Sequence, residues 1–249
     1  KAIHGGQDKA FIRRDLDDFV FEKKGQDWFM QAPLTIKTNI ARINAMLRLL
    51  EAESHTQLDP TANPLDRFQL DKPKIIMKLN DHEFLFGNTD AIDQRRYILF
   101  NSKIHLTNDF LYQQLTTNAA FFAETRLLPG NMEIESIQFP ANKLNKLGDE
   151  WQLETLIDIK PTELKRIVNS WKQAVAISAS FYAEPETDSN ITIISSNGAK
   201  INFAIVKTEP HLVLGRKDIG IQYHMGSDET EKLLLKQNTE DLHTSETIE

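Results

Sequence analysis

Histidine is the side chain in this sequence best suited to bind a metal ion, and the chain contains seven. Four of them, His82, His105, His211 and His224, lie in or beside segments predicted to be strands. None forms a His-x-His or His-Glu-x-x-His pair, and the neighbours His82 and Glu83 point to opposite faces of a strand. We therefore expect scattered surface histidines, with no metal site and no cofactor.

Signatures of covalent and nucleotide chemistry are also missing from the sequence. The chain has no cysteine, which excludes thiol nucleophiles, thiolate metal sites and disulfides. It contains no Gly-x-Ser-x-Gly, Gly-x-x-x-x-Gly-Lys or Gly-x-Gly-x-x-Gly motif. Triads and carboxylate pairs need only meet in space, so a hydrolase stays open as a third alternative. We predict a non-catalytic protein without catalytic residues.

One loop concentrates charges of both signs. Asp90, Asp93, Arg95 and Arg96 lie close together between two predicted strands. A calcium loop needs more acids at alternating positions and a central glycine, so the functional interpretation is that the arginines face an anionic partner. The alternative is a solvated loop whose local ion pairs contribute little. These four residues are the candidate interaction loop.

Three tryptophans are the largest apolar side chains available to a core. Trp28 and Trp151 each follow a glycine-containing turn, and Trp171 lies on the apolar face of a predicted helix. The first two could form a stacking platform for a sugar or an aromatic ligand. Burial in the core is favoured, because such rings supply a large apolar area. We expect all three to be structural core anchors.

The elements that position these residues follow one pattern twice. A hairpin with a glycine turn comes first, then one helix-period segment and a strand-rich meander, and a short helix closes the pattern. In the first copy, Thr38 is the expected N-cap, and a proline-containing linker, residues 53–73, should cross the surface between helix and meander. The expected elements are hairpin 19–30, helix 39–52, strands 74–79, 83–86, 96–100 and 103–107, and helix 109–115.

The second copy repeats this order with hairpin 134–153, helix 161–177, strands 191–195, 201–206, 212–214 and 219–224, and helix 228–236. We predict an α+β fold of two tandem pseudo-repeats, each a mostly antiparallel β-meander sheet packed by one long amphipathic helix. The expected organisation is a flexible lead-in, residues 1–10, a first α+β lobe, 11–128, a second α+β lobe, 129–236, and an acidic disordered tail, 237–249.

Charge and hydropathy limit the partners. A formal net charge of -7 argues against nucleic acid, because neutralising phosphates requires a basic face. No stretch approaches the roughly 20 apolar residues of a membrane-spanning helix. The chain begins at Lys1 and not at Met. We therefore expect a missing N-terminal segment, either an anchor or a cleaved signal.

Several short motifs resemble those of the family called domain of unknown function 4340. The resemblance covers most of residues 19–171. It rests on EKKGQDW at 22–28, Pro33, NIARI at 39–43, LL at 49–50, FQLDKP at 68–73 and RYIL at 96–99. The family often has glycine in an aromatic-Gly-Leu-x-x-Pro element where this chain has Gln69. Glycine would permit a tight backbone bend at that point.

The resemblance implies a bacterial envelope protein that lies outside the cytoplasmic membrane behind one N-terminal anchor helix. In some relatives it is encoded beside ABC-type transporter or gliding-motility components. We therefore expect a periplasmic, membrane-anchored scaffold or adaptor that binds other envelope proteins, among them transporter-like components. The alternative is a protein that binds a solute, glycan or lipid in the cleft between the lobes.

Overall fold

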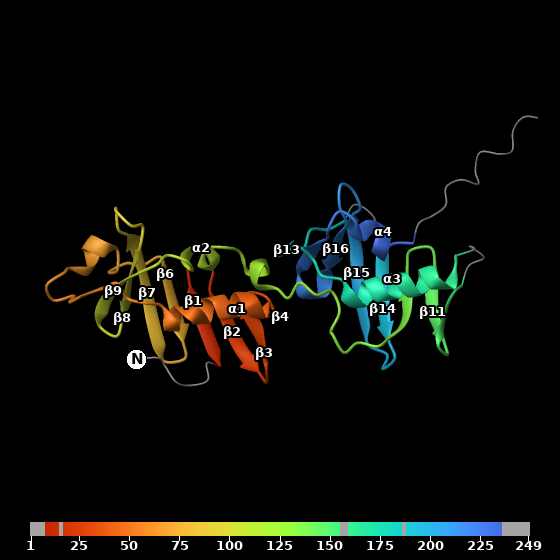
Figure 1. Ribbon diagram of the computed structural model, residues 1–249, viewed down its shortest axis with the longest axis horizontal. Coiled ribbons are helices and arrows are strands. Elements are labelled where there is room, and N and C mark those ends of the chain that lie inside the picture. Colours follow the sequence, from red (N-terminus) through yellow and green to blue (C-terminus); the bar gives the residue numbers. More distant parts are fainter. Residues whose placement is uncertain (1–7, 15–16, 155–158, 186–187, 236–249) are drawn as a thin grey trace, which may run out of the picture. The chain divides into compact units, whose positions relative to one another are not determined.

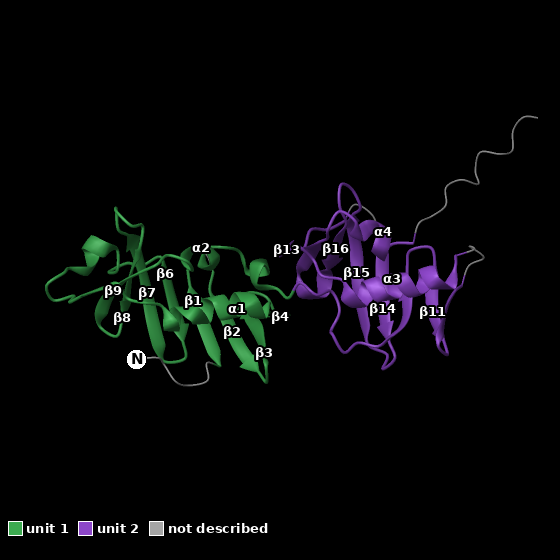
Figure 2. Cartoon of the chain, in the orientation of Figure 1, with its two compact units in different colours: residues 1–124 green, residues 125–249 purple. Residues whose placement is uncertain are grey.

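The computed structural model describes residues 8–14, 17–154, 159–185 and 188–235. Most of the expected lead-in and the whole expected tail, residues 237–249, lie outside this part of the chain. The chain divides into two compact units, Lys1–Glu124 and Thr125–Glu249 (Figure 2). Both contain a mostly antiparallel sheet with few helices, as expected for an α+β fold (Figure 1).

The first unit is built on a nine-stranded sheet with the order β4-β3-β2-β1-β6-β7-β8-β9-β5. Its strands are β1 Lys9–Arg13, β2 Phe19–Lys24, β3 Asp27–Ala32, β4 Ile36–Lys37, β5 Thr56–Leu58, β6 Ile75–Leu79, β7 His82–Thr89, β8 Arg96–Phe100 and β9 Lys103–Thr107. The last two coincide with predicted strands. The expected lead-in extends too far, because Lys9 and Ala10 belong to β1, where alternation buries Ala10 and Ile12.

The helices of the first unit are shorter than expected. They are α1 Ile40–Leu47, α2 Tyr112–Leu115 and three 3₁₀ turns, η1 Arg48–Glu51, η2 Leu65–Phe68 and η3 Ala119–Phe122. The N-cap of α1 is Asn39, whose side chain accepts from the backbone N–H groups of Ala41 and Arg42. Thr38 is not the cap, because its hydroxyl donates to the carbonyl of Trp28, at 2.8 Å, and ties the chain to β3.

The segment expected to be a surface linker, residues 53–73, is largely exposed, but it contributes two buried side chains to the first unit's core. It contains β5, which pairs with β9, and η2. Phe68 and Leu70 are buried and pack in one cluster with Ile104 of β9. Between them Gln69 adopts the left-handed conformation, with φ 56° and ψ 34°. The bend that glycine would permit therefore forms with glutamine in its place.

Replacing Gln69 with glycine should stabilise the first unit. The left-handed conformation costs a residue with a Cβ atom about 1–2 kcal/mol, and the greater backbone entropy of glycine in the unfolded chain offsets about 0.5–1 kcal/mol of the gain. We expect Gln69→Gly to raise the free energy of unfolding by up to about 1 kcal/mol, measured by urea denaturation. The matched control is Gln57→Gly in β5, which should lower it. Equal losses of unfolding free energy in both variants would show that the left-handed backbone at Gln69 is not strained.

The second unit is built on an eight-stranded sheet with the order β12-β11-β10-β14-β15-β16-β17-β13. Its strands are β10 Ile134–Gln138, β11 Lys143–Leu147, β12 Glu150–Leu153, β13 Ser178–Phe181, β14 Asn190–Ser195, β15 Lys200–Lys207, β16 Val213–Arg216 and β17 Ile221–His224. Its helices are α3 Pro161–Gln173, α4 Glu229–Leu233 and the 3₁₀ turn η4 Lys217–Ile219. Among the described residues, no helix is both long and apolar enough to span a membrane.

Helix α3 covers one face of the second sheet. It opens with proline, which a first turn tolerates, and buries Leu164, Ile167, Val168 and Trp171 on one side. The helix was expected to continue to residue 177 but ends at Gln173. Residues 174–176 are extended instead, because they hydrogen-bond to residues 125–127. This early end frees the chain to form β13.

The chain passes through the two sheets in the same order. The series β3-β2-β1-β6-β7-β8-β9-β5 in the first unit corresponds, strand by strand, to β12-β11-β10-β14-β15-β16-β17-β13 in the second. In both, a helix follows the hairpin, and the next strand crosses to the far edge of the sheet. Of the described strands, only β4 has no counterpart.

Candidate functional site

The charged loop between β7 and β8 uses its charges to shape itself. The Asp90 carboxylate accepts hydrogen bonds from the backbone N–H groups of Ile92, Asp93 and Arg95, at 3.1, 2.8 and 2.9 Å. These bonds, the one from Asp93 foremost, hold the pKa of Asp90 below its ordinary value. Asp93 forms an ion pair with Arg95 at 3.1 Å. The loop therefore keeps Asp90, Asp93 and Arg95 together.

Arg96 does not belong to this loop surface. It is the first residue of β8 and is 9% exposed. Its Nε and Nη2 atoms donate to the two carboxylate oxygens of Asp109, at 2.9 and 2.7 Å, and Nη1 donates to the carbonyl of Gly87. Its guanidinium carbon lies 3.5 Å from the centre of the Tyr112 ring. Arg96 therefore does not face outward beside Arg95, because Asp109, Gly87 and Tyr112 hold its guanidinium.

The three tryptophans lie at different depths. Trp28 and Trp171 are buried, whereas Trp151 is partly exposed on β12, the edge strand of the second sheet. An edge strand has a neighbour on one side only, so a ring there loses part of its cover. Trp151 is therefore only partly buried, whereas burial in the core was expected of it.

Two histidines make contacts that the sequence pattern could not reveal. Ser180 Oγ lies 2.8 Å from His224 Nε2, and Ser54 Oγ lies 3.0 Å from His105 Nδ1. Burial lowers the pKa of both imidazoles. Within the described ranges, no carboxylate hydrogen-bonds to either ring, so neither pair has the acid that orients a catalytic histidine. Nor do any three His, Asp or Glu residues there gather to hold a metal ion.

The feature best suited to binding is the edge strand β13. Its register pairs Ser178 with His224 and Ser180 with Gln222 of β17, and the Tyr182 N–H donates to the Gly220 carbonyl at 3.0 Å. In an antiparallel pair only alternate residues bond to the neighbouring strand. The N–H and C=O groups of Ala179 and Phe181 therefore point away from the sheet, toward a side where the described residues provide no further strand.

Apolar side chains run along the same edge. Ile177 is 72% exposed and Phe181 is 48% exposed. Val175, two residues before Ile177, is also exposed. Phe181 pairs with the buried Ile221 of β17, so this row extends the core face of the sheet. Covering such side chains with an added segment is favourable, because it removes apolar surface from water.

The other sheet edges carry features that discourage strand addition. β4 contains Lys37, β12 begins with Glu150, and β5 is three residues long and is followed by Asp59. Charges and short length are the usual protection of an edge. β13, with the sequence SASF, contains neither charge nor proline. Its chemistry is that of a strand left open to pairing.

Comparison with known proteins identifies a family. A family model described as "Domain of unknown function (DUF4340)" matches residues 28–202. This range includes residues of both units. No curated protein and no solved structure matches the chain.

Proposed function

The chain belongs to the DUF4340 family, and we propose that it is a non-catalytic binding module that pairs with an extended segment of a partner protein along β13. The observation that supports this most strongly is an edge strand without charge or proline, which follows the exposed Ile177 and ends with the exposed Phe181. Backbone hydrogen bonds supply affinity in strand addition, and side-chain pockets supply specificity.

The bound segment would extend the sheet by one strand. Its backbone would exchange hydrogen bonds with Ala179 and Phe181, whose N–H and C=O groups point outward. Its alternate side chains would cover Ile177 and Phe181. Burying each of these two side chains contributes on the order of 1 kcal/mol, since each is already partly covered. The apolar row thus selects a partner strand with apolar residues at every second position.

The cellular setting is part of the same proposal. We place the protein in the bacterial envelope, outside the cytoplasmic membrane and held there by an N-terminal anchor, with other envelope proteins such as transporter components as partners. We further propose that its two units are tandem copies of one ancestral unit. The shared strand order of the two sheets supports this interpretation.

A photo-cross-linking experiment tests the edge. A photoreactive phenylalanine analogue replaces Phe181 in the full-length protein in cells, and the captured peptide is mapped by mass spectrometry. We expect an extended segment of a specific envelope protein, joined at β13. The control position is Leu147, an exposed apolar residue of β11 away from this edge, which should capture none of it.

A second variant separates strand pairing from general stickiness. Ile177→Lys places a charge beside the edge, as natural edges do, and should reduce capture by the photoreactive analogue at position 181 at least tenfold. Leu147→Lys, which removes a similarly exposed apolar side chain, should leave capture unchanged. Equal capture in both variants, or no specific protein in either, would refute binding at β13.

A further inference from the structure

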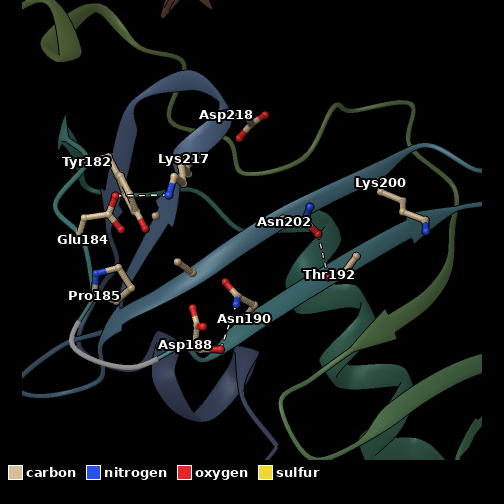
Figure 3. Close-up of a pocket in the computed structure, with 12 residues that line it drawn as sticks. Tyr182, Glu184, Pro185, Asp188, Asn190, Thr192, Lys200, Asn202, Lys217 and Asp218 are labelled. Atoms are coloured by element: carbon tan, nitrogen blue, oxygen red, sulfur yellow. Dashed lines mark hydrogen bonds and ion pairs between the residues drawn. The ribbon is translucent and has the colours of Figure 1, made fainter.

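A groove of about 780 Å³ lies on the second unit, and its lining includes Tyr182, the residue that follows β13 (Figure 3). Its floor is formed by β14, β15 and β16. Trp171 of α3 packs against Phe203 of β15. The residues on either side of Phe203, Asn202 and Ala204, therefore face the other way. The groove therefore opens on the sheet face opposite α3, called the outer face below.

Small residues create the hollow. Across the outer face, Asn190, Ala204, Gly215 and Gln222 are direct neighbours on four successive strands. The middle two have almost no side chain. A Cβ atom on Gly215 would lie 2.2 Å from a ring carbon of Tyr182, so glycine is required for that ring to lie against the strand. The sheet thus has a depression whose wall is an aromatic ring.

Neutral hydrogen-bonding groups line the floor beside this ring. The Thr192 hydroxyl donates to Asn202 Oδ1 at 2.8 Å, which leaves the Asn202 amide nitrogen as a donor. The Asn190 amide nitrogen donates to the backbone carbonyl of Asp188 at 3.1 Å, which leaves Asn190 Oδ1 as an acceptor. Figure 3 shows Thr192 of β14 beside Asn202 of β15, with Asn190 farther along β14. The floor can therefore both donate to and accept from hydroxyl groups.

The charges around the groove largely cancel. Lys217 pairs with Glu184 at 3.5 Å, and Asp218 pairs with Arg216 at 2.7 Å. The remaining charged side chains of the lining are Asp188 and Lys200, one of each sign. A site with this balance has no excess charge to attract an anion or a cation.

We infer that the outer-face groove binds a neutral oligosaccharide. The face of the Tyr182 ring fits the C–H face of a sugar ring, and Asn190, Thr192 and Asn202 fit its hydroxyl groups. The volume falls within the range of ligand sites, about 300–1,000 Å³. This inference does not depend on the pairing proposed at β13, because Tyr182 and Phe181 project from opposite faces of the chain.

The test uses the full 249-residue chain and defined sugars. Maltohexaose, cellohexaose and chitohexaose are the neutral probes, and hexagalacturonate is the anionic one, with association followed by isothermal titration calorimetry. We expect at least one neutral probe to bind with one-to-one stoichiometry. Binding of none, or of hexagalacturonate alone, would overturn the inference.

Variants locate the binding. Tyr182→Ala should weaken association about tenfold, whereas Tyr182→Phe, which keeps the ring, should stay within about threefold of wild type. Asn202→Ala should weaken it threefold to tenfold. Phe181→Ala is the matched control and should bind sugar like wild type. Unchanged affinity in a folded Tyr182→Ala protein would also overturn the inference. Cross-linking from β13 in the same variant reports separately on the proposed partner site.

Discussion

Trp171→Ala is expected to lower the free energy of unfolding of the second unit by about 3–5 kcal/mol, the usual loss for a fully buried aromatic side chain. Trp171 is 0% exposed. Its ring lies 5.4 Å from that of Phe203, and its Nε1–H donates to the Leu233 carbonyl at 2.9 Å. The substitution therefore opens a cavity and also removes the donor that holds α4 to α3.

The loss reaches the lower end of the stability of an ordinary domain, which is about 5–15 kcal/mol. It should be measured by hydrogen exchange of backbone amides in urea, because a chain of two units need not unfold in a single transition. Protection should fall in β14 and β15 and stay unchanged in β1 and β6. Trp151→Ala is the control, since that ring is partly exposed and should cost less. A smaller loss for Trp171 than for Trp151 would contradict the packing described.

Arg96→Ala should lower the free energy of unfolding of the first unit by about 3–5 kcal/mol. The guanidinium holds both carboxylate oxygens of Asp109 and the Gly87 carbonyl, and it stacks on Tyr112. Its removal leaves the carboxylate of Asp109, which is only 22% exposed, without its counter-charge. The link between β8 and the start of α2 is then lost.

The neighbouring arginine provides the control. Arg95 makes one ion pair with Asp93 at the surface loop, and Arg95→Ala should change stability by less than about 1 kcal/mol. Arg96→Lys keeps the charge but cannot form the paired hydrogen bonds or stack as a plane, so an intermediate loss is expected. Thermal unfolding of the four proteins gives the comparison. Similar midpoints for Arg95→Ala and Arg96→Ala would show that Arg96 is not a structural link.

The sequence predicted the strands of long, regular alternation well. β8 and β9 lie where expected, and β14 and β15 extend the predicted ranges by one residue at one or both ends. In each case the alternation of buried and exposed side chains is local, and a tight turn separates the pair. β4 and β5 were missed, because strands of two and three residues carry too few alternations to stand out. β1 and β13 were missed because β1 begins inside the polar stretch predicted to be a lead-in, and β13 directly follows the segment predicted to be a helix.

The edge strand β13 shows why the binding candidate could not be found in advance. The apolar positions of residues 174–177 continue the helical period of α3, so the pattern predicted one helix to residue 177. Residues 174–176 instead hydrogen-bond to residues 125–127, and these bonds replace those that a longer helix would form. Val175 and Ile177 are β-branched, a local signal for strand that was outweighed by periodicity.

Local chemistry along the chain was enough to establish two α+β units rich in antiparallel strands, the absence of thiol chemistry and the family. These properties depend on residue type and on spacing over a few positions. Partners distant in the chain settled the rest. Asp109 pairs with Arg96 and holds it inward. The carbonyl of Trp28 in β3 accepts from the Thr38 hydroxyl, so Thr38 does not cap the helix. Gly215 leaves room for the Tyr182 ring. Such contacts join residues far apart in sequence, and no spacing rule encodes them.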